Sequence, residues 1–285
     1  MNPDFRAAFL ELLRRDLSRY GMRERTPRSW PLRRKLMLHG ANVLNACASA
    51  MAGVNPFGNL KRELGRDWPA EALTMIGMRR LASLQECVET VLHDDVEGDL
   101  VECGVWRGGA AIFMRAVLEL HGNTDKSVWL ADSFEGLPAP DTVNYQMDSK
   151  IRLDYFAPIL GVSEQQVRAN FRRYGLLDER VRFLPGWFKD TLTHAPIGQI
   201  AVLRLDGDLY ESTIQALEAL YPKLSPGGFC IIDDYSVLPV CKQAVTDYRN
   251  KQNITAEIVD IDGVGVLWRK ESQRRPANNA ARPIR

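Results

Sequence analysis

The sequence predicts an α/β fold in which a mostly parallel sheet ends in an antiparallel hairpin, behind an N-terminal helical cap. Short, continuous apolar runs at 128–131, 200–203 and 229–232 are typical of strands buried on both faces. Amphipathic segments alternate with these runs, which indicates parallel strands joined by helical crossovers. The last two apolar runs, 257–260 and 265–268, are separated only by a short glycine turn, so we expect them to pair as a hairpin.

The first 66 residues form the predicted helical cap. Apolar residues recur at helical spacing over 4–20, and a second helix is expected over 32–52. The apolar part of the second helix contains His39, Asn42 and Asn45, which favours a packed helix over a membrane span. We therefore expect residues 1–66 to cover the following domain.

The segment that follows the cap is also helical in pattern. Pro69 suits a first helical turn and Asp67 is a capping candidate, so a helix is expected to begin there. The pattern is interrupted at 74–77 and resumes over 79–91.

The sheet begins at Asp99, and it belongs to a predicted domain over 67–270. The basic tail 271–285 carries two prolines and is expected to be disordered. The predicted strands are 99–106, 127–134, 181–185, 200–206 and 228–233, and the predicted helices between them are 109–121, 163–173, 211–222 and 239–251.

Charge and cysteine content restrict the functional class. The chain has 37 Lys and Arg against 36 Asp and Glu, so its net charge of +1 gives no general attraction to nucleic acid or to anionic membranes. Five scattered cysteines without a CxxC pair fit buried thiols in a reducing compartment. No N-terminal signal pattern is present. These observations predict a cytoplasmic protein with neither a membrane span nor a nucleic-acid partner.

The stretch 99–109 combines an apolar strand, an acidic residue and a glycine-rich turn that leads into a helix. This arrangement is how α/β folds bind nucleotide-like ligands. Glu102 closes the strand and can accept from a ligand's ammonium or ribose groups, while Gly104 allows close approach. Trp106 and Arg107 stand where a pyrophosphate site requires glycine, which argues against a nicotinamide dinucleotide.

The second strand also ends in an acid, Asp132, which can accept hydrogen bonds from ribose hydroxyls. A dinucleotide would use the same acid, so Asp132 alone does not identify the cofactor. The terminal hairpin does separate the two, because it is the usual ending of the Rossmann-like, seven-stranded sheet of S-adenosylmethionine (SAM) methyltransferases. The sequence therefore favours SAM, which has no pyrophosphate.

Two later strands end in acidic residues. Asp206 and Asp208 follow one strand, and Asp233 and Asp234 follow the next. Because parallel strands place their carboxyl ends at one edge of the sheet, Asp206 is expected to meet Asp233 and Asp234. Packed carboxylates repel one another unless a cation neutralises them, and oxygen ligands suit Mg²⁺, with Ca²⁺ or Mn²⁺ as substitutes. The metal ligands are predicted to be Asp206, Asp233 and Asp234.

The stretch 135–150 is long and polar, with no helix or strand pattern. A loop of this length inside an α/β domain is usually functional, and we interpret it as a lid.

Six ordered motifs resemble the macrocin-type O-methyltransferase family, whose members methylate sugar hydroxyls on macrolides, aminocoumarins and related glycosides. The resemblance covers about residues 67–269, and Thr74-Met75-Ile76-Gly77 also matches, whereas residues 1–66 do not match clearly. The motifs lie at 102–109, 131–138, 170–178, 183–191, 203–213 and 226–235.

The resemblance implies a SAM- and metal-dependent enzyme and assigns roles by position. The implied acceptor contacts are Thr74, Met75 and Tyr210, and the catalytic acids are Asp206 and Asp208, with the choice of base left open. N-terminal helices in this family help to form subunit contacts, so a homodimer or higher homo-oligomer is expected. The implied SAM contacts are Glu102, Gly104, Val105, Trp106, Arg107, Gly109, Asp132, Ser133, Gly186, Trp187, Phe188 and Asp206, with residues 186–188 beside the adenine.

The expected function is Mg²⁺-assisted methylation of a sugar hydroxyl on a small-molecule glycoside of a natural-product pathway, such as antibiotic biosynthesis. One alternative is a metal-dependent methyltransferase of catechols or phenols, which uses the same acids. Another is a SAM-binding protein without catalysis that acts as a partner in a biosynthetic complex. A nucleic-acid methyltransferase that uses the basic termini is a weaker alternative, and it predicts strongly salt-dependent binding to RNA or DNA.

Overall fold

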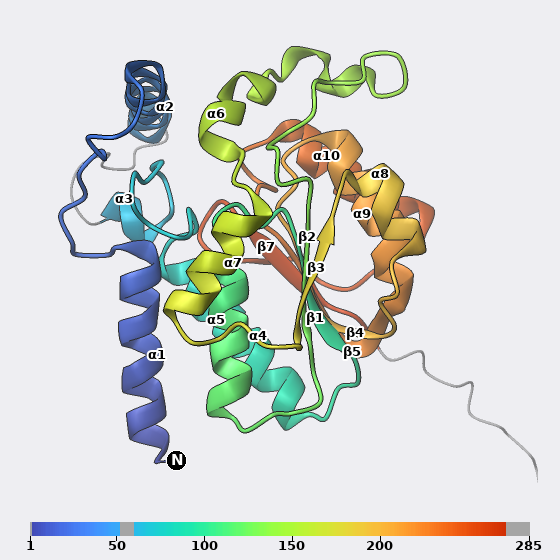
Figure 1. The fold of residues 1–285 in the computed structure, drawn as a ribbon. Coiled ribbons are helices and arrows are strands. Elements are labelled where there is room, and N and C mark those ends of the chain that lie inside the picture. Colours follow the sequence, from blue (N-terminus) through green and yellow to red (C-terminus); the bar gives the residue numbers. More distant parts are fainter. Residues whose placement is uncertain (1, 52–59, 272–285) are drawn as a thin grey trace, which may run out of the picture.

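A central sheet with helices on both faces forms the body of the molecule (Figure 1). The computed structural model describes residues 2–51 and 60–271. The strands are β1 (Asp99–Cys103), β2 (Val128–Asp132), β3 (Val181–Pro185), β4 (Ile200–Leu205), β5 (Leu224–Ile232), β6 (Val259–Asp260) and β7 (Val266–Arg269). The helices are α1 (Pro3–Ser18), α2 (Leu32–Met51), α3 (Leu60–Glu63), α4 (Met78–His93), α5 (Gly109–Leu120), α6 (Ala157–Leu160), α7 (Glu164–Arg173), α8 (Phe188–Thr191), α9 (Tyr210–Leu220) and α10 (Pro239–Lys251). Short 3₁₀ turns lie at η1 (Gln146–Lys150), η2 (Leu153–Phe156), η3 (Leu192–His194) and η4 (Tyr221–Lys223).

The sheet has seven strands in the order β3-β2-β1-β4-β5-β7-β6. Neighbouring strands from β3 to β5 are parallel, whereas β7 is antiparallel to both β5 and β6. The predicted α/β class, the terminal hairpin and the N-terminal helices are therefore confirmed. The observed strands begin and end within a few residues of the predicted bounds. The largest difference is at the start of β5, which begins at Leu224 instead of residue 228.

Each face of the sheet has its own apolar core. Successive strand residues point to opposite faces. Leu100 belongs to the core that includes residues of α1, α4, α5 and α7, while Val101 belongs to the core that includes residues of α9 and α10. Figure 1 shows these two helical layers on either side of the strands. The carboxyl ends of β1, β2, β3, β4 and β5 then share one edge, where the candidate site lies.

The first strand is shorter than predicted, because β1 ends at Cys103. Gly104 has a φ of +82°, and a Cβ at this position would lie 1.9 Å from the carbonyl oxygen of Asp206. Trp106 also has a positive φ, of 48°. Gly104 is therefore required by the close packing of the β1 turn against the end of β4, in addition to any approach of a ligand.

The helix predicted to begin at Asp67 is absent, since residues 67–77 form no helix and α4 begins only at Met78. The physical reason lies far away in the sequence. The carboxylate of Glu24 accepts from the backbone N–H groups of Ala70 at 3.0 Å and Ala72 at 2.9 Å. The Ala72 N–H is thus bound to a side chain of the N-terminal segment instead of to a helical carbonyl, whereas the Ala70 N–H, in the first turn, would have no helical acceptor in any case.

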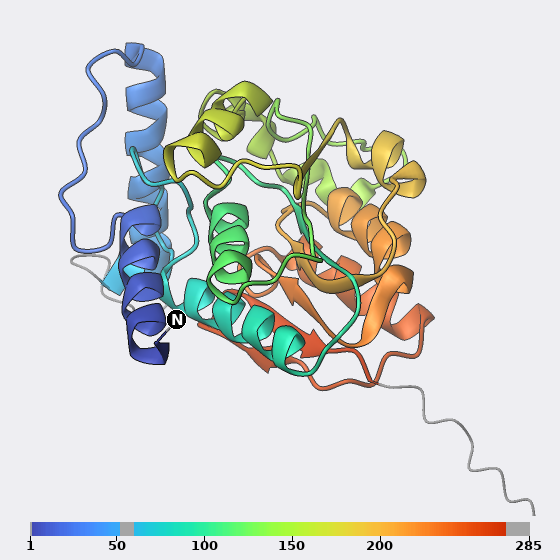
Figure 2. The same ribbon diagram turned by 60° about the horizontal axis from the view of Figure 1, so that its bottom comes forward.

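The N-terminal segment divides into two parts. Leu10, Leu13 and Leu17 of α1 are buried in the same core as the sheet, whereas α2 lies at the outside of the body and contacts α6 (Figures 1 and 2). Within the described residues, no helix has the length and apolarity needed to cross a bilayer. The predicted disordered tail lies outside the described residues, apart from Glu271.

Candidate active site

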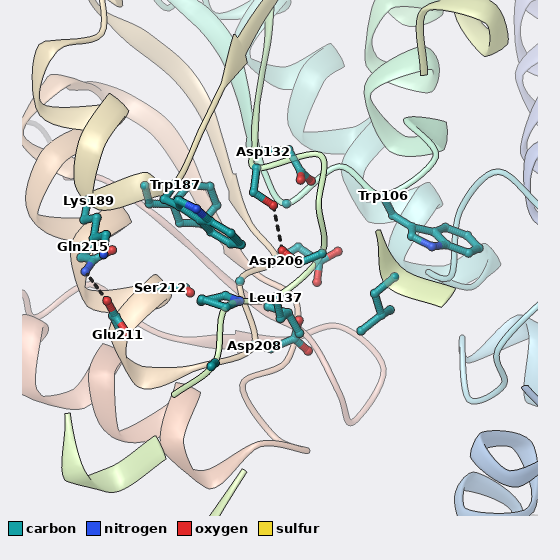
Figure 3. A pocket seen from close by; sticks show the side chains of 18 of the residues that line it. Trp106, Asp132, Leu137, Trp187, Lys189, Asp206, Asp208, Glu211, Ser212 and Gln215 are labelled. Atoms are coloured by element: carbon teal, nitrogen blue, oxygen red, sulfur yellow. Dashed lines mark hydrogen bonds between the residues drawn. The ribbon is translucent and has the colours of Figure 1, made fainter. Parts of the chain in front are cut away.

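A cavity of about 340 Å³ opens at the carboxyl edge of the parallel strands (Figure 3). This volume lies within the range of small-molecule sites. The turns after β1, β2, β3 and β4 form its floor, and the start of α9 forms one wall. The lining residues are Met75, Gly104, Trp106, Asp132, Ser133, Gly136, Leu137, Pro138, Ala139, Asp141, Leu160, Trp187, Phe188, Lys189, Asp206, Gly207, Asp208, Glu211, Ser212 and Gln215.

Asp132 is held firmly at the end of β2. Its carboxylate accepts from the backbone N–H of Val105 at 2.6 Å and from that of Phe134 at 2.7 Å. Burial raises the pKa of Asp132, while these backbone donors oppose that rise. The predicted residues Gly104, Trp106, Asp132 and Ser133 all line the cavity.

The turn after β3 brings two aromatic side chains to the cavity. Trp187 and Phe188 line it, as the resemblance implies for an adenine pocket, and Figure 3 shows Trp187 facing the space. Gly186 does not reach the lining. Its φ of +132° instead allows the turn, and its N–H donates to the Asp132 carbonyl at 2.9 Å.

Four other predicted SAM contacts lie away from the cavity. Glu102 is only 1% exposed and accepts from Arg204 at 2.5 Å. Val105 is buried, and a Cβ on Gly109 would lie 2.5 Å from the Leu73 carbonyl oxygen, so both residues support the turn. Arg107 points to the opposite side of the turn from the cavity lining, where it donates to a backbone carbonyl.

Glu102 is buried beneath the site, and burial raises its pKa to about 8 despite the neighbouring Arg204. One of its oxygens, Oε2, has no hydrogen-bond partner among the described residues. Its contact is therefore with the arginine below the site. The predicted contact with the ligand's ammonium or ribose stays a prediction.

Three carboxylates form a cluster beside the cavity. Oxygen atoms of Asp206, Asp208 and Asp234 all lie within 4.8 Å of one another. Burial and the neighbouring negative charges raise the pKa of Asp208 and of Asp234 well above the ordinary value. The Oδ2 atom of Asp234 is buried without a hydrogen-bond partner among the described residues. An all-oxygen set with surplus negative charge fits a divalent cation such as Mg²⁺.

This cluster differs from the predicted metal set, because Asp208 takes the place of Asp233. Asp233 is buried and forms ion pairs with Arg80 and with Arg204, the latter at 2.6 Å. Adjacent residues at the end of a strand point to opposite sides. Asp234 therefore faces the cluster, while Asp233 is directed to the arginines beneath it.

Sequence reasoning missed the two arginines that organise these acids. Arg204 is 2% exposed and pairs with Glu102, Asp233 and, at 3.0 Å, Asp206. Arg80 of α4 pairs with Asp233 and with Asp262. A charged residue inside the fully buried strand β4 was the available signal for Arg204, since such a residue is almost never buried unpaired.

Of the three predicted acceptor residues, one lines the cavity and two do not. Met75 lines the cavity, whereas Thr74 is 5% exposed and its hydroxyl accepts from the Ile76 N–H. Tyr210 lies outside the lining and donates its hydroxyl proton to Asp247 at 3.0 Å. The wall also contains five residues that were not predicted as site residues, namely Leu160, Lys189, Glu211, Ser212 and Gln215.

The predicted lid forms part of the cavity. Residues 136–139 and Asp141 line it directly. Further along the loop, the fully buried Asp148 accepts from the N–H groups of Tyr210 at 2.8 Å and Glu211 at 3.0 Å. One carboxylate therefore fastens the loop to the first turn of α9.

Comparisons with known proteins agree with this architecture. The profile of the macrocin O-methyltransferase (TylF) family matches residues 6–270, so the likeness includes most of the N-terminal segment as well as the predicted 67–269. A tetracenomycin enzyme of Streptomyces olivaceus, 8-demethyl-8-(2,3-dimethoxy-α-L-rhamnosyl)-tetracenomycin-C 4'-O-methyltransferase, is 62% identical over 208 residues, which cover 73% of this chain and 79% of that protein.

Two further proteins match over most of their length. Mycinamicin III 3''-O-methyltransferase of Micromonospora griseorubida is 46% identical over 266 residues, which cover 93% of this chain and 96% of that protein. The solved structure of the O-methyltransferase NovP is 46% identical, with a TM-score of 0.80 over 94% of this chain and 100% of that one. The chain therefore belongs to the macrocin O-methyltransferase (TylF) family and is a SAM-dependent O-methyltransferase.

Proposed function

We propose that this enzyme methylates a sugar hydroxyl of a glycosylated natural product, with Mg²⁺ bound by Asp206, Asp208 and Asp234. The observation that carries the proposal is the acidic cluster at the wall of the SAM cavity. The names of two relatives support the substrate class, since one acts on a rhamnosyl tetracenomycin and the other on mycinamicin III. A sugar hydroxyl is a weak nucleophile, so it needs both orientation and removal of its proton.

The three carboxylates would hold the cation through oxygen atoms, which are the ligands that Mg²⁺ prefers. When bound, the cation would lower the pKa of the acceptor hydroxyl and help to orient it. Arg204 donates a hydrogen bond to Asp206 and thereby holds this metal-binding carboxylate in place. The buried Oδ2 of Asp234, without a partner in the described part of the chain, is a natural second ligand atom.

The side chains of the cavity position the two substrates. We assign the adenine of SAM to Trp187 and Phe188, and the methionine part to the turn at Gly104. Trp106 and Leu137 add apolar wall that excludes water from the reacting groups. Holding two reactants in line supplies about 7–11 kcal/mol of barrier reduction in favourable cases.

Asp208 is the better candidate for the base. Its carboxylate lines the cavity and takes part in no ion pair among the described residues, so it is directed at the space where the acceptor would lie. Asp206 has an arginine partner, so its negative charge is already balanced in part.

The test is a turnover assay with SAM and Mg²⁺ against a panel of deoxysugar glycosides and one catechol. We expect one glycoside to gain a single methyl group by mass spectrometry, and we expect excess EDTA to abolish that gain. Methylation of the catechol alone would contradict the sugar assignment. Full turnover in EDTA would contradict the metal assignment.

A further inference from the structure

A second cavity, of about 400 Å³, lies on the other side of the glycine-rich turn from the active site. Two pairs of consecutive residues lie between the two cavities. Trp106 and Leu160 line the active site, whereas Arg107 and Gly161 line the second cavity. Its remaining walls come from residues 27–34, 70–73 and the α7 region. It is thus a separate space that borders the active site.

The most buried charged residue that lines this cavity is Arg107. Its side chain is almost fully buried, since the residue is only 8% exposed, and it donates to the Ala72 carbonyl at 2.7 Å. The guanidinium also stacks on the Trp106 ring, 4.0 Å from its centroid. A carbonyl and an aromatic face do not neutralise the positive charge, and burying such a charge without a counter-ion is costly.

Arg34 of α2 adds a second cation. Its guanidinium lies 4.0 Å from the centroid of the Trp30 ring, and that of Arg107 lies 5.9 Å from the same centroid. The Nε atom of Arg34 is buried with no hydrogen-bond partner among the described residues. Burial and the charge of Arg34 lower the pKa of Arg107 to about 10.

Within residues 2–51 and 60–271, no acid forms an ion pair with either Arg34 or Arg107. The charge of Glu24 does act on Arg107, but its carboxylate is bound to Arg62 at 3.5 Å and to the N–H groups of Ala70 and Ala72. The remaining residues, 1, 52–59 and 272–285, contain no Asp or Glu at all. Glu71 does line the cavity, but it faces Arg19 at 3.4 Å. A third arginine, Arg173, lies at the exposed end of the cavity.

We propose that this basic cavity binds the phosphate group of a small molecule. Guanidinium groups match phosphate oxygens in geometry and form strong, charge-assisted hydrogen bonds with them. Arg34 and Arg107 would contact the phosphate, and the Trp30 ring would remain beside it. The proposal does not depend on which acceptor the enzyme methylates.

Calorimetric titration of the full chain with SAM bound tests this proposal. Pyrophosphate and uridine diphosphate are the two probes, and EDTA is present so that no divalent ion can bridge a probe to the acidic cluster. We expect a dissociation constant below about 1 mM at low salt, rising as NaCl is added. Tighter binding of uridine diphosphate would identify a nucleotide as the source of the phosphate, whereas equal binding would identify a free anion.

Two neighbouring arginines on α2 provide a matched pair of variants. Arg34→Gln is expected to weaken pyrophosphate binding at least about tenfold. Arg33→Gln removes an exposed charge of the same helix that does not line the cavity, so binding should stay close to wild type. Should Arg34→Gln fail to fold, Arg173→Gln at the exposed end is expected to weaken binding about threefold. No heat with either probe, or equal weakening by Arg33→Gln and the cavity variant, would overturn the proposal.

Discussion

At the scale of single residues, the acidic cluster depends on an unusual backbone conformation. Asp208 has a φ of 61°, in the left-handed region that non-glycine residues seldom adopt. Such a conformation costs on the order of 1 kcal/mol and persists where its surroundings fix it, often at functional sites. Here it accompanies a carboxylate that meets Asp206 and Asp234.

Asp208→Asn tests the role of this residue in catalysis. The amide neither accepts the acceptor's proton nor supplies a charged metal ligand, so we expect turnover to fall at least about 100-fold. Affinity for Mg²⁺, measured by calorimetry, should fall as well. SAM affinity should remain near wild type. Wild-type turnover in this variant would contradict both roles.

Asp233→Asn tests whether Asp233 binds the metal or only pairs with the arginines beneath the acidic cluster. Because Asp233 pairs with Arg80 and Arg204 beneath the site, we expect a loss of stability of about 3 kcal/mol. Urea unfolding measures that loss, with Asp208→Asn as the comparison variant. Were Asp233 instead a metal ligand, Mg²⁺ affinity would fall sharply and unfolding would change little.

Glu102 links the stability of the site to pH. Its pKa is about 8 in the folded protein, above the ordinary value of 4.5, so the folded state holds a proton that the unfolded state releases. Its contribution to stability is therefore complete below pH 4.5 and is lost as the pH rises towards 8. Glu102→Gln keeps the neutral form at every pH.

We accordingly expect the melting temperature of Glu102→Gln, relative to wild type, to increase between pH 5 and pH 8, by on the order of 5 °C. Thermal unfolding at several pH values measures this. A variant that is less stable at pH 8 than at pH 5, relative to wild type, would indicate that Glu102 is ionised and paired with Arg204.

At the scale of elements, the carboxylate of Asp148 hydrogen-bonds the loop between β2 and α7 to the start of α9. Asp148 accepts from the first two N–H groups of α9, which have no partner within the helix. Asp148→Ala should cost about 1–2 kcal/mol and loosen the segment that lines the cavity. Limited proteolysis should then cut 135–156 faster, and the KM for the acceptor should rise. Asp154→Ala, in an exposed pair with Arg152, is the control, and equal cleavage of both variants would contradict this role.

The elements also show what local sequence can predict. A buried parallel strand is a short, continuous apolar run, so β2 and β4 were predicted from their own residues. The terminal hairpin was predicted from two such runs joined by a short glycine turn. The false helix at Asp67 and the exchange of Asp208 for Asp233 have non-local causes. The first depends on Glu24, some 46 residues away, and the second on the buried arginines Arg80 and Arg204. Among the predicted site residues, those in single turns, such as Gly104 and Trp187, line the cavity.

At the scale of the whole molecule, the predicted boundary at residue 66 does not coincide with a boundary of the core. Leu10, Leu13 and Leu17 of α1 share a core with α4, α5 and the sheet. Because this core is continuous, we expect a fragment of residues 67–270 to aggregate instead of folding. The family match, which begins at residue 6, agrees with this expectation.

A pair of leucine variants in α1 tests the same point without truncation. Leu17 is fully buried, so Leu17→Ala should lower the free energy of unfolding by about 3 kcal/mol through the cavity it leaves. Leu12, on the same helix, is 65% exposed, and Leu12→Ala should change stability by less than about 0.5 kcal/mol. Urea unfolding followed by circular dichroism measures both values. If the two variants unfold alike, α1 contributes little to the core, and residues 1–66 form a separable cap after all.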